Sequence, residues 1–273
     1  LHPFAATVGW CMSGGARGRA LGQRVTVRAW QDHGPRRPHP DLRRDYDAVL
    51  PGWTDEDVAG SPYSIADYAV PKTLGGDDEL KQFRAKLNKL GLKLILDFVP
   101  NHLGLDHAWV RAQPDLFVQS PKQVAGTFEV KTTTGPRWIA HGKDPYFAPW
   151  TDVAQLDYRR PATRNAMRKL LLSVAAKCDG VRCDMAMLLL NEVFARTWAH
   201  LPTDGPKLAL EFWPEAIKET KQTQPGFIFM AEVYWGLEGQ LQSLGFDYTY
   251  DKALYDDLIW RHAAEAQRKL LAH

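Results

Sequence analysis

Cysteine is scarce in this sequence: the 273 residues include only Cys11, Cys178 and Cys183, and none of them lies in a CxxC motif. Three thiols cannot all pair within one chain, so the sequence favours a reducing compartment over a disulfide scaffold and offers no thiolate metal site. No apolar run approaches the roughly 18–20 residues that span a bilayer. The first 20 residues also lack a basic stretch ahead of an apolar one, so we predict no signal peptide and expect a cytoplasmic protein that does not act at a membrane.

An excess of charge of one sign is also absent, since 34 Lys and Arg stand against 32 Asp and Glu, for a formal net charge of +2. Binding to a phosphate backbone usually needs clustered positive charge. One local cluster, interrupted by a glycine and three prolines, is either a polyanion site or a solvated loop: Arg17, Arg19, Arg24, Arg28, Arg36, Arg37, Arg43 and Arg44. We favour the solvated loop and expect no nucleic-acid partner.

What the sequence does contain is a helix followed by a buried strand, repeated three times. In the first copy, apolar residues recur at helical spacing after Asp77, which is available as the N-cap, and Gly91 ends the helix. These apolar residues are Leu80, Phe83, Leu87 and Leu90. Residues 92–99 then form an almost wholly apolar run that Pro100 ends, which predicts a buried strand.

The second and third copies have the same order. A helix expected from Pro161 precedes a short strand at 181–184, and a helix expected from Pro214 is broken at 225–226, before a strand at 227–231. Short apolar strands that each follow an amphipathic helix indicate an α/β protein with a parallel sheet.

Other segments do not follow this repeat. Residues 103–160 are too long for an ordinary connection between strands, so we predict an inserted subdomain there. The stretch 31–70 is loop-like because of its Pro and Gly, 23–30 alternates as a strand, and 1–20 has no period. Aromatic residues of the insertion form either its own core or walls that stack on a ligand: Trp109, Phe117, Phe128, Trp138, Tyr146, Phe147 and Trp150.

Each of the three predicted strands ends with an acidic residue: Asp97, Asp184 and Glu232. Reactive groups of parallel α/β folds gather at the C-terminal ends of strands, where the sheet opens to a crevice. One acid there is often structural, but three in successive units indicate a site. Arg182 lies two residues before Asp184, so their side chains share one face of the strand. Such an Arg keeps a buried carboxylate ionised, as a nucleophile requires.

Four motifs give the sequence its resemblance to a known family. DFVPNH (97–102), GVRCD (180–184) and EVYW (232–235) are similar, in order and approximate spacing, to the first three conserved regions of the α-amylase family of glycoside hydrolases, family 13. SPYSIADY (61–68) is similar to the stretch before the first region. The resemblance covers about residues 60–273. It implies a (β/α)8 TIM barrel with a B subdomain inserted after strand 3.

The implied division has three parts. Residues 1–102 are the N-terminal part of the barrel, with strands 2 and 3 the clearest. Residues 103–160 are the inserted B subdomain, and 161–273 continue the barrel with strands 4 and 5 and the following helix.

The same resemblance implies catalytic roles. Asp184 matches the nucleophile and Glu232 the general acid/base of a retaining mechanism, whose carboxyl groups need to lie about 5–5.5 Å apart. Arg182 matches the residue that orients the nucleophile.

Four further residues form the substrate-binding set that the resemblance implies. His102 matches a residue that hydrogen-bonds the sugar, and Tyr63 matches an aromatic platform under it. A satisfied core histidine and a packing tyrosine remain the plainer alternatives for these two. Asp97, expected to support the site from below, and Trp235, from the EVYW motif, complete the set.

The sequence departs from the family pattern after Glu232. The family's third carboxylate, in an NHD motif after strand 7, has no match, and residues 233–273 cannot hold strands 6–8 because a βα unit takes roughly 30 residues. We therefore predict an incomplete barrel whose open edges lead to self-association or low stability. The acids here look like the approach to helix 5 or a loop, and none is given a role: Asp247, Asp251, Asp256 and Asp257.

A second departure concerns calcium, which the family often binds. Gln155 in AQLDY stands where the family usually has a calcium-binding Asp, and Asn101 matches the remaining common ligand. One amide oxygen is far from the six to eight oxygens that calcium takes. Met187 and Leu188 replace a Lys-His pair of the family. We expect no required cofactor, and Asn101 is a metal ligand only if calcium binds.

The resemblance thus implies a retaining hydrolase of α-glucosidic bonds in starch or maltooligosaccharides, whose partner is an α-linked oligo- or polysaccharide. A transglycosylase or isomerase of the same family would use the same residues. Because the third carboxylate is missing, a sugar-binding protein without turnover, or a fragment whose parent enzyme supplies the rest, stays open as an alternative.

Overall fold

The centre of the molecule is a six-stranded sheet. The computed structural model describes residues 6–7, 24–27, 31–32, 43–57, 61–132, 135–201, 203 and 210–272. The sheet has the order β1 (Ala6–Thr7), β2 (Arg24–Val27), β5 (Lys93–Phe98), β11 (Gly180–Cys183), β12 (Ile228–Ala231) and β13 (Tyr248–Thr249). Neighbours from β2 to β13 are parallel, whereas β1 pairs antiparallel with β2. The predicted α/β class with a parallel sheet is confirmed.

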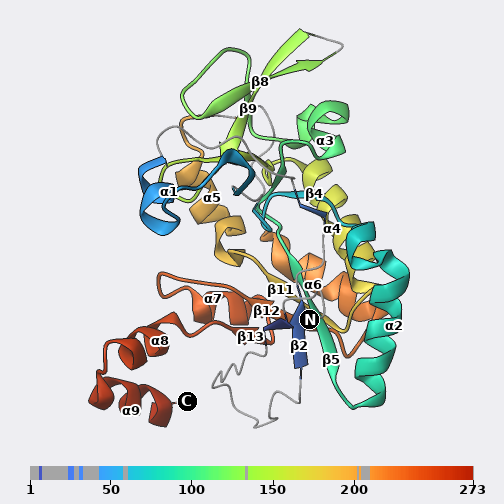
Figure 1. Cartoon of the computed structure of the whole chain (residues 1–273), viewed down its shortest axis with the longest axis vertical. Coiled ribbons are helices and arrows are strands. Elements are labelled where there is room, and N and C mark those ends of the chain that lie inside the picture. The colour runs from blue at the N-terminus through green and yellow to red at the C-terminus, as the bar shows by residue number, and fades with distance from the viewer. Residues whose placement is uncertain are drawn as a thin grey trace.

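Each predicted helix–strand unit is present. The helix α2 (Gly76–Lys89) leads into β5, α4 (Pro161–Ala175) into β11, and α6 (Phe212–Thr223) into β12. All three helices lie on the same side of the sheet in Figure 1. The predicted stop at Gly91 is also found, because this residue takes the left-handed conformation, at φ 73°, that glycine adopts without strain.

The start of α2 differs from the prediction. Its N-cap is Gly75, at φ 92°, and Asp77 lies inside the first turn. The Asp77 carboxylate accepts hydrogen bonds from the backbone N of Val70 (3.1 Å) and from Lys177 Nζ (2.7 Å). It therefore fastens the preceding loop and the turn after the helix at 161–175 instead of capping its own helix.

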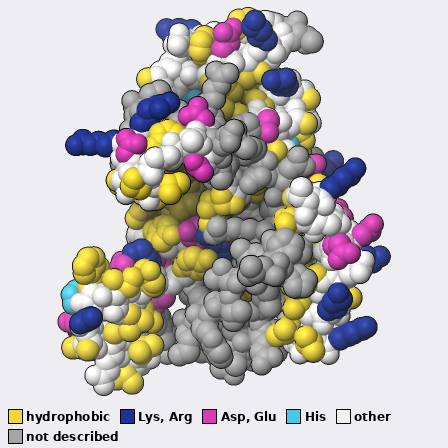
Figure 2. Space-filling model, viewed as in Figure 1, with side chains coloured by type: hydrophobic (Ala, Val, Ile, Leu, Met, Phe, Trp, Pro, Cys, Tyr) yellow, Lys and Arg dark blue, Asp and Glu magenta, His cyan; other side chains and the backbone are white. Residues whose placement is uncertain are grey.

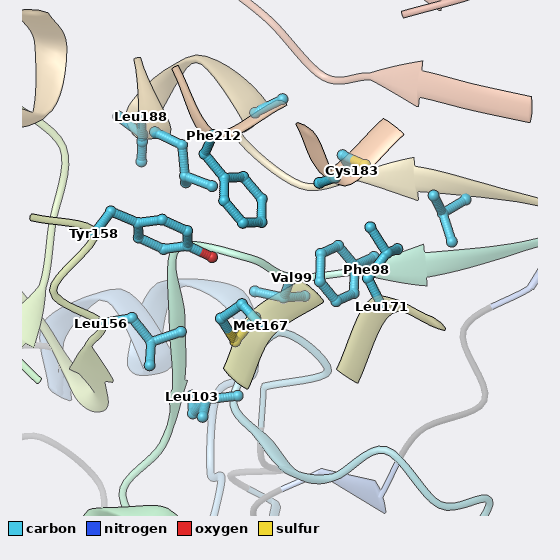
Figure 3. Packing of buried hydrophobic residues seen from close by; sticks show 14 of the residues in the cluster. Phe98, Val99, Leu103, Leu156, Tyr158, Met167, Leu171, Cys183, Leu188 and Phe212 are labelled. Atoms are coloured by element: carbon cyan, nitrogen blue, oxygen red, sulfur yellow. The ribbon is translucent and has the colours of Figure 1, made fainter. Parts of the chain in front are cut away.

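The core lies between the sheet and these helices (Figure 3). Here α6 begins at Phe212, two residues before the predicted start at Pro214, because Phe212 and Trp213 are both buried in the core and proline is accepted in a first helical turn. Tyr158 packs edge to face against Phe212 and donates its hydroxyl proton to the carbonyl of Pro100 (2.7 Å). Around them pack Phe98, Val99, Leu103, Leu156, Met167, Leu171, Cys183 and Leu188.

The chain leaves the parallel sheet after β5 and forms an antiparallel unit before it returns at α4. Its strands are β6 (His102–Gly104), β7 (Gln119–Ser120), β8 (Thr127–Thr132), β9 (Gly135–Gly142) and β10 (Trp150–Gln155). Their order is β6–β10–β9–β7, and β8 pairs with β9. The helix α3 (Ala108–Ala112) and a 3-10 turn (Pro114–Leu116) join β6 to β7. The hairpin of β8 and β9 projects at the top of Figure 1.

Regular structure also forms in the stretch 31–70, which the sequence predicted as loop-like. Here β3 (Gln31–Asp32) pairs antiparallel with β4 (Ile65–Asp67), and the helix α1 (Arg43–Val49) precedes a 3-10 turn (Asp55–Asp57). Further short elements are 3-10 turns at Lys72–Leu74 and Ala186–Leu189 and the helix α5 (Asn191–Thr197).

The segment after β12 corrects the sequence prediction. It forms α7 (Glu238–Ser243), β13, α8 (Lys252–Ile259) and α9 (Ala263–Ala272). Residues 248–249 are thus a sixth strand, parallel to β12, and not a loop or the approach to a helix. Asp251, given no role from the sequence, is the N-cap of α8, where its carboxylate accepts a hydrogen bond from the backbone N of Leu254 (2.8 Å).

The described sheet is open, with β1 and β13 at its two edges. Hydrophobic side chains gather on α8, α9 and the turn between them, at the lower left of Figure 2, and six of them are about half exposed or more: Tyr255, Leu258, Ile259, Trp260, Leu270 and Leu271. Self-association through open edges stays a prediction. Among the residues that the structure describes, no helix combines the length and the apolarity needed to cross a membrane.

Candidate active site

Parallel pairing brings the predicted catalytic residues to one end of the sheet. Asp97 on β5 lies opposite Arg182 on β11, and Arg182 lies opposite Met230 on β12. Asp184 and Glu232 each come directly after the last residue of their strand. Because these strands are in register, the acids meet at the C-terminal edge of the sheet, and all four ionisable side chains are buried.

Arg182 contacts all three carboxylates. Its Nη1 donates to Asp97 Oδ1 (3.0 Å) and Asp184 Oδ1 (2.8 Å), and its Nη2 donates to Glu232 Oε2 (2.6 Å). Burial opposes the charge of the guanidinium, but the three carboxylates raise the pKa of Arg182 above its ordinary value. One fixed positive charge therefore faces three acids, which leaves the site with an excess of negative charge when all of them are ionised.

Burial and this excess of negative charge both act on the titration of Asp184. Burial raises the pKa of Asp184 to about 7; Arg182 opposes this shift, and the charges of Glu232 and Asp97 add to it. Near neutral pH the Asp184 carboxyl group therefore changes between its protonated and ionised forms.

Glu232 is held by hydrogen bonds on both oxygens. Oε2 accepts from Arg182 and from the backbone N of Met185 (3.0 Å), while Oε1 accepts from the Tyr234 hydroxyl (2.5 Å). Met185 has a left-handed backbone, at φ 44°, which is uncommon for a residue with a side chain. This conformation aims its N–H at Glu232 and so ties the loop after β11 to the end of β12.

Asp184 and Glu232 line one cavity of about 390 Å³, within the range of about 300–1,000 Å³ typical of small-molecule sites. Tyr63 and His102, two of the predicted substrate-binding residues, line it too. The remaining lining residues are Ser61, Trp150, Asp152, Val153 and Met185. Figure 2 shows acidic and basic side chains deep in a hollow between the upper and lower parts of the molecule.

His102 is a neutral ring in this cavity wall. Burial lowers its pKa to about 4, although the Asp152 charge and a hydrogen bond with the Tyr63 backbone oppose the shift. Asn101 Nδ2 lies 3.2 Å from His102 Nδ1. Since an amide NH2 group can only donate, Nδ1 accepts, and the proton of the neutral ring is on Nε2.

The other two predicted substrate-binding residues do not line the cavity. Asp97 accepts a hydrogen bond from Arg182, and its role in supporting the site stays a prediction. Trp235 is 39% exposed and packs edge to face against Tyr146, with ring centroids 5.0 Å apart. Among the aromatic residues of the antiparallel unit, Phe117 is in the core, and Trp150 packs against the core and lines the cavity. Stacking of these rings on a ligand stays a prediction.

Sequence reasoning missed two tyrosines. Tyr234, whose hydroxyl binds Glu232, lies in the EVYW motif, and its spacing of two residues from Glu232 was the available signal. Tyr250 accepts a hydrogen bond from Arg182 Nε (3.1 Å), with the guanidinium 5.5 Å from its ring centroid. It could be found only by recognising β13, because the pairing of β13 with β12 carries Tyr250 to the site.

Asn101, named as a metal ligand only if calcium binds, does not present its side-chain oxygen to a cation. Gln155 Nε2, a hydrogen-bond donor, lies 3.0 Å from Asn101 Oδ1, so the amide of Gln155 occupies the direction in which Asn101 would coordinate a metal. Among the residues that the structure describes, no group of three or more His, Cys, Asp and Glu side chains could hold a metal ion.

Most of the arginine cluster lies outside the described residues, and its assignment to a solvated loop stays a prediction. In α1, Arg43 lies 4.0 Å from Asp55 Oδ1 and 5.4 Å from the Trp53 ring centroid.

Buried carboxylates at the ends of parallel strands, beside a neutral histidine and an aromatic ring, are the type of site that glycoside hydrolases build on α/β barrels. The family model of the α-amylase catalytic domain matches residues 53–254. The chain therefore belongs to the α-amylase family of glycoside hydrolases.

Relatives agree with this assignment. The chain is 27% identical over 226 residues to trehalose-6-phosphate hydrolase of Escherichia coli, which covers 71% of this chain and 40% of that protein. It is 30% identical over 149 residues to maltase 1 of Drosophila virilis, covering 48% of this chain and 24% of the maltase. An α-amylase from Lactobacillus plantarum is similar in structure, with a TM-score of 0.54 and 25% identity over 78% of this chain and 46% of that one. The chain thus spans less than half the length of these relatives.

Proposed function

We propose that this chain hydrolyses α-glucosidic bonds of starch or maltooligosaccharides with retention of configuration. The observation that carries the proposal is that Asp184 and Glu232, on adjacent strands, line one cavity and are bridged by the same guanidinium, at 2.8 and 2.6 Å. The names of its relatives, a trehalose-6-phosphate hydrolase and a maltase, support α-glucosides as the substrate class.

In the proposed mechanism, ionised Asp184 attacks the anomeric carbon while Glu232 gives its proton to the leaving oxygen. The glycosidic bond breaks, and a glycosyl ester forms on Asp184. Glu232, now ionised, takes a proton from water, whose oxygen attacks the same carbon and releases Asp184. Arg182 orients both carboxylates and opposes the raised pKa of Asp184, which favours the ionised form of the nucleophile.

We assign substrate contacts to the residues of the cavity wall. Tyr63 offers a ring for stacking on the sugar, and the His102 imidazole lines the same cavity as a hydrogen-bonding group. Asp97 acts through Arg182. The exposed pair of Trp235 and Tyr146 lies outside the cavity and suits a more distant sugar of an oligosaccharide.

We further propose that the antiparallel unit corresponds to the B subdomain of the family, within a division at 1–102, 103–160 and 161–273. Its support is that β6 and β10 pair with each other at the place where the chain leaves and re-enters the parallel layer. Trp150 and Asp152, both on β10, line the same cavity as Asp184 and Glu232.

Replacing Glu232 tests the proposal. The chain should release sugar from maltooligosaccharides, and Glu232→Gln should lower that rate by about 100- to 10,000-fold, because the leaving oxygen then departs without a proton. The variant should lose far less on an α-glucosyl fluoride, whose leaving group needs little help. Added azide should speed its second step and give an α-glucosyl azide. The exposed Glu192→Gln is the matched control and should leave every rate unchanged.

Equal losses of Glu232→Gln on good and poor leaving groups would contradict the assignment of Glu232 as the acid. If the chain bound maltooligosaccharides but neither it nor Glu192→Gln released sugar, the sugar-binding alternative would replace the proposed activity. One observation favours that alternative: Asp184, with a pKa raised to about 7, is only partly ionised at neutral pH.

Turnover should also depend on pH through Asp184. The attack needs the ionised carboxylate, and burial raises the pKa of Asp184 to about 7. We therefore expect kcat/KM to rise between about pH 5 and 8, with the midpoint of the rise near the pKa of this free-enzyme group. Initial rates on an aryl α-glucoside measure it, with preincubation at each pH as the control for stability. A flat profile over this interval would place the ionisation of Asp184 near the ordinary value of about 3.9.

A further inference from the structure

The amides of Asn101 and Gln155 form a buried clasp at the base of the antiparallel unit. Asn101 Nδ2 donates to Gln155 Oε1 (3.2 Å), and Gln155 Nε2 donates back to Asn101 Oδ1 (3.0 Å). Asn101 is 1% exposed and Gln155 is fully buried. The backbone carbonyls of Asn101 and Leu156 can only accept, and they lie beside Gln155 Nε2, so they fix which end of Gln155 is nitrogen and, through it, which end of Asn101 is oxygen.

The clasp joins the two chain segments that connect the unit to the parallel layer. Asn101 lies between β5 and β6, where the chain leaves the layer, and Gln155 is the last residue of β10, where it returns. Backbone pairing runs through the same place, since Gln155 lies opposite His102 and the N–H of Leu156 donates to the Asn101 carbonyl (3.2 Å). The side chains thus brace the junction of the unit with the cavity wall.

Three oxygens converge on one atom of the clasp. Gln155 Nε2 lies 2.9 Å from the Asn101 carbonyl, 3.0 Å from Asn101 Oδ1 and 3.1 Å from the Leu156 carbonyl. An NH2 group has two protons for these three acceptors. A ring of neutral oxygens around one electropositive centre is the environment that a hard cation takes, and here the centre is a side-chain nitrogen.

We infer that the Gln155 amide replaces a structural cation at this junction, so that the unit is fastened without metal. The oxygens contributed by Asn101 and Leu156 form a latent site, which becomes a divalent-cation site when the amide nitrogen is exchanged for a carboxylate oxygen. The inference concerns stability and does not depend on the proposed glycosidase activity.

Thermal unfolding of the whole chain at pH 8 tests it, in EDTA and in millimolar CaCl2. The wild type should have the same Tm in both. Gln155→Glu places a negative oxygen among three others, so its Tm in EDTA should fall by about 5 °C or more, and calcium should restore at least about half of the loss. Gln123→Glu, the same exchange at an exposed position of the same unit, should not respond to calcium.

Gln155→Met removes both amide bonds without adding charge. Its Tm should fall equally in EDTA and in calcium, which separates loss of the clasp from creation of a site. If Gln155→Glu is isolated unfolded, its far-ultraviolet circular dichroism is followed as calcium is added, and folding should return.

A wild type that calcium stabilises or EDTA destabilises would overturn the inference, since a metal would then bind beside the amide. A calcium-insensitive Gln155→Glu would overturn the latent site, and an unchanged Tm of Gln155→Met would show that the clasp does not hold the junction. None of these experiments measures turnover. Their results therefore do not depend on whether the chain has glycosidase activity.

Discussion

Asp184→Asn is expected to lose sugar release by at least about 1,000-fold and, at the same time, to be more stable than the wild type at pH 8. The loss follows because the amide cannot form the glycosyl ester. The gain follows because burial raises the pKa of Asp184 to about 7, above an unfolded value of about 3.9. The stabilising contribution of such a group is present below the unfolded pKa and is lost as pH rises through the folded pKa. At pH 8 the buried charge destabilises the wild type, and the neutral amide does not.

We expect the free energy of unfolding of Asp184→Asn to exceed that of the wild type by about 1–3 kcal/mol at pH 8 and to match it near pH 4. Denaturant unfolding at the two pH values measures this difference, and taking a difference cancels the contributions of groups that both proteins share, such as His102. Product analysis of maltooligosaccharide digests measures the activity.

Asp97→Asn is the matched control, because this acid also binds Arg182 but does not line the cavity. Its activity should fall much less than that of Asp184→Asn. Equal losses would mean that both variants act through Arg182, and Asp184 would lose its assignment as the nucleophile. An Asp184→Asn protein that is no more stable than the wild type at pH 8 would show that burial and the neighbouring acids do not disfavour the ionised carboxylate.

Much of the fold could be predicted from local pattern. The apolar spacing of α2, α4 and α6 and the apolar runs of β5 and β12 depend on nearby residues, so periodicity finds them. The acids at the strand ends are visible for the same reason. The antiparallel unit could be expected as an insertion, whereas its strand order depends on pairing between distant segments.

The missed features depend on long-range contacts. The strand β13 has two residues and no apolar pattern, and it exists because Tyr248 lies in register with Met230. Tyr250 reaches Arg182 through that pairing alone. Asp77 looked like a helix cap by its sequence position, but Lys177, 100 positions later, binds it instead. The amide clasp is equally invisible, since its two residues are 54 positions apart.

Arg182→Met is expected to cause the largest loss of stability in the chain. The Arg182 side chain is 5% exposed, and its guanidinium lies 3.0, 2.8 and 2.6 Å from carboxylate oxygens of Asp97, Asp184 and Glu232. Breaking a buried ion pair by removing one partner typically costs about 3–5 kcal/mol, because an uncompensated charge is left behind. Here three acids lose the same partner, and the free energy of unfolding of a typical domain is only about 5–15 kcal/mol. We expect Tm at pH 8 to fall by about 10 °C or more.

The pH dependence of this loss identifies its cause. Without Arg182 nothing opposes the raised pKa of Asp184, and a raised folded pKa makes stability higher where the group is protonated. The deficit of Arg182→Met relative to the wild type should therefore shrink between pH 8 and about pH 5.

Two further variants serve as controls. Arg182→Lys keeps the charge but cannot reach all three acids with a planar fork, so its Tm at pH 8 should lie between those of the wild type and Arg182→Met. Arg84→Met, which breaks the more exposed pair with Asp179 at 2.8 Å, controls for loss of any ion pair. Its deficit should be smaller, because the surrounding water screens the remaining charge. A deficit of Arg182→Met that is the same at both pH values would mean that lost packing and hydrogen bonds, and not the repulsion of three acids, destabilise the site.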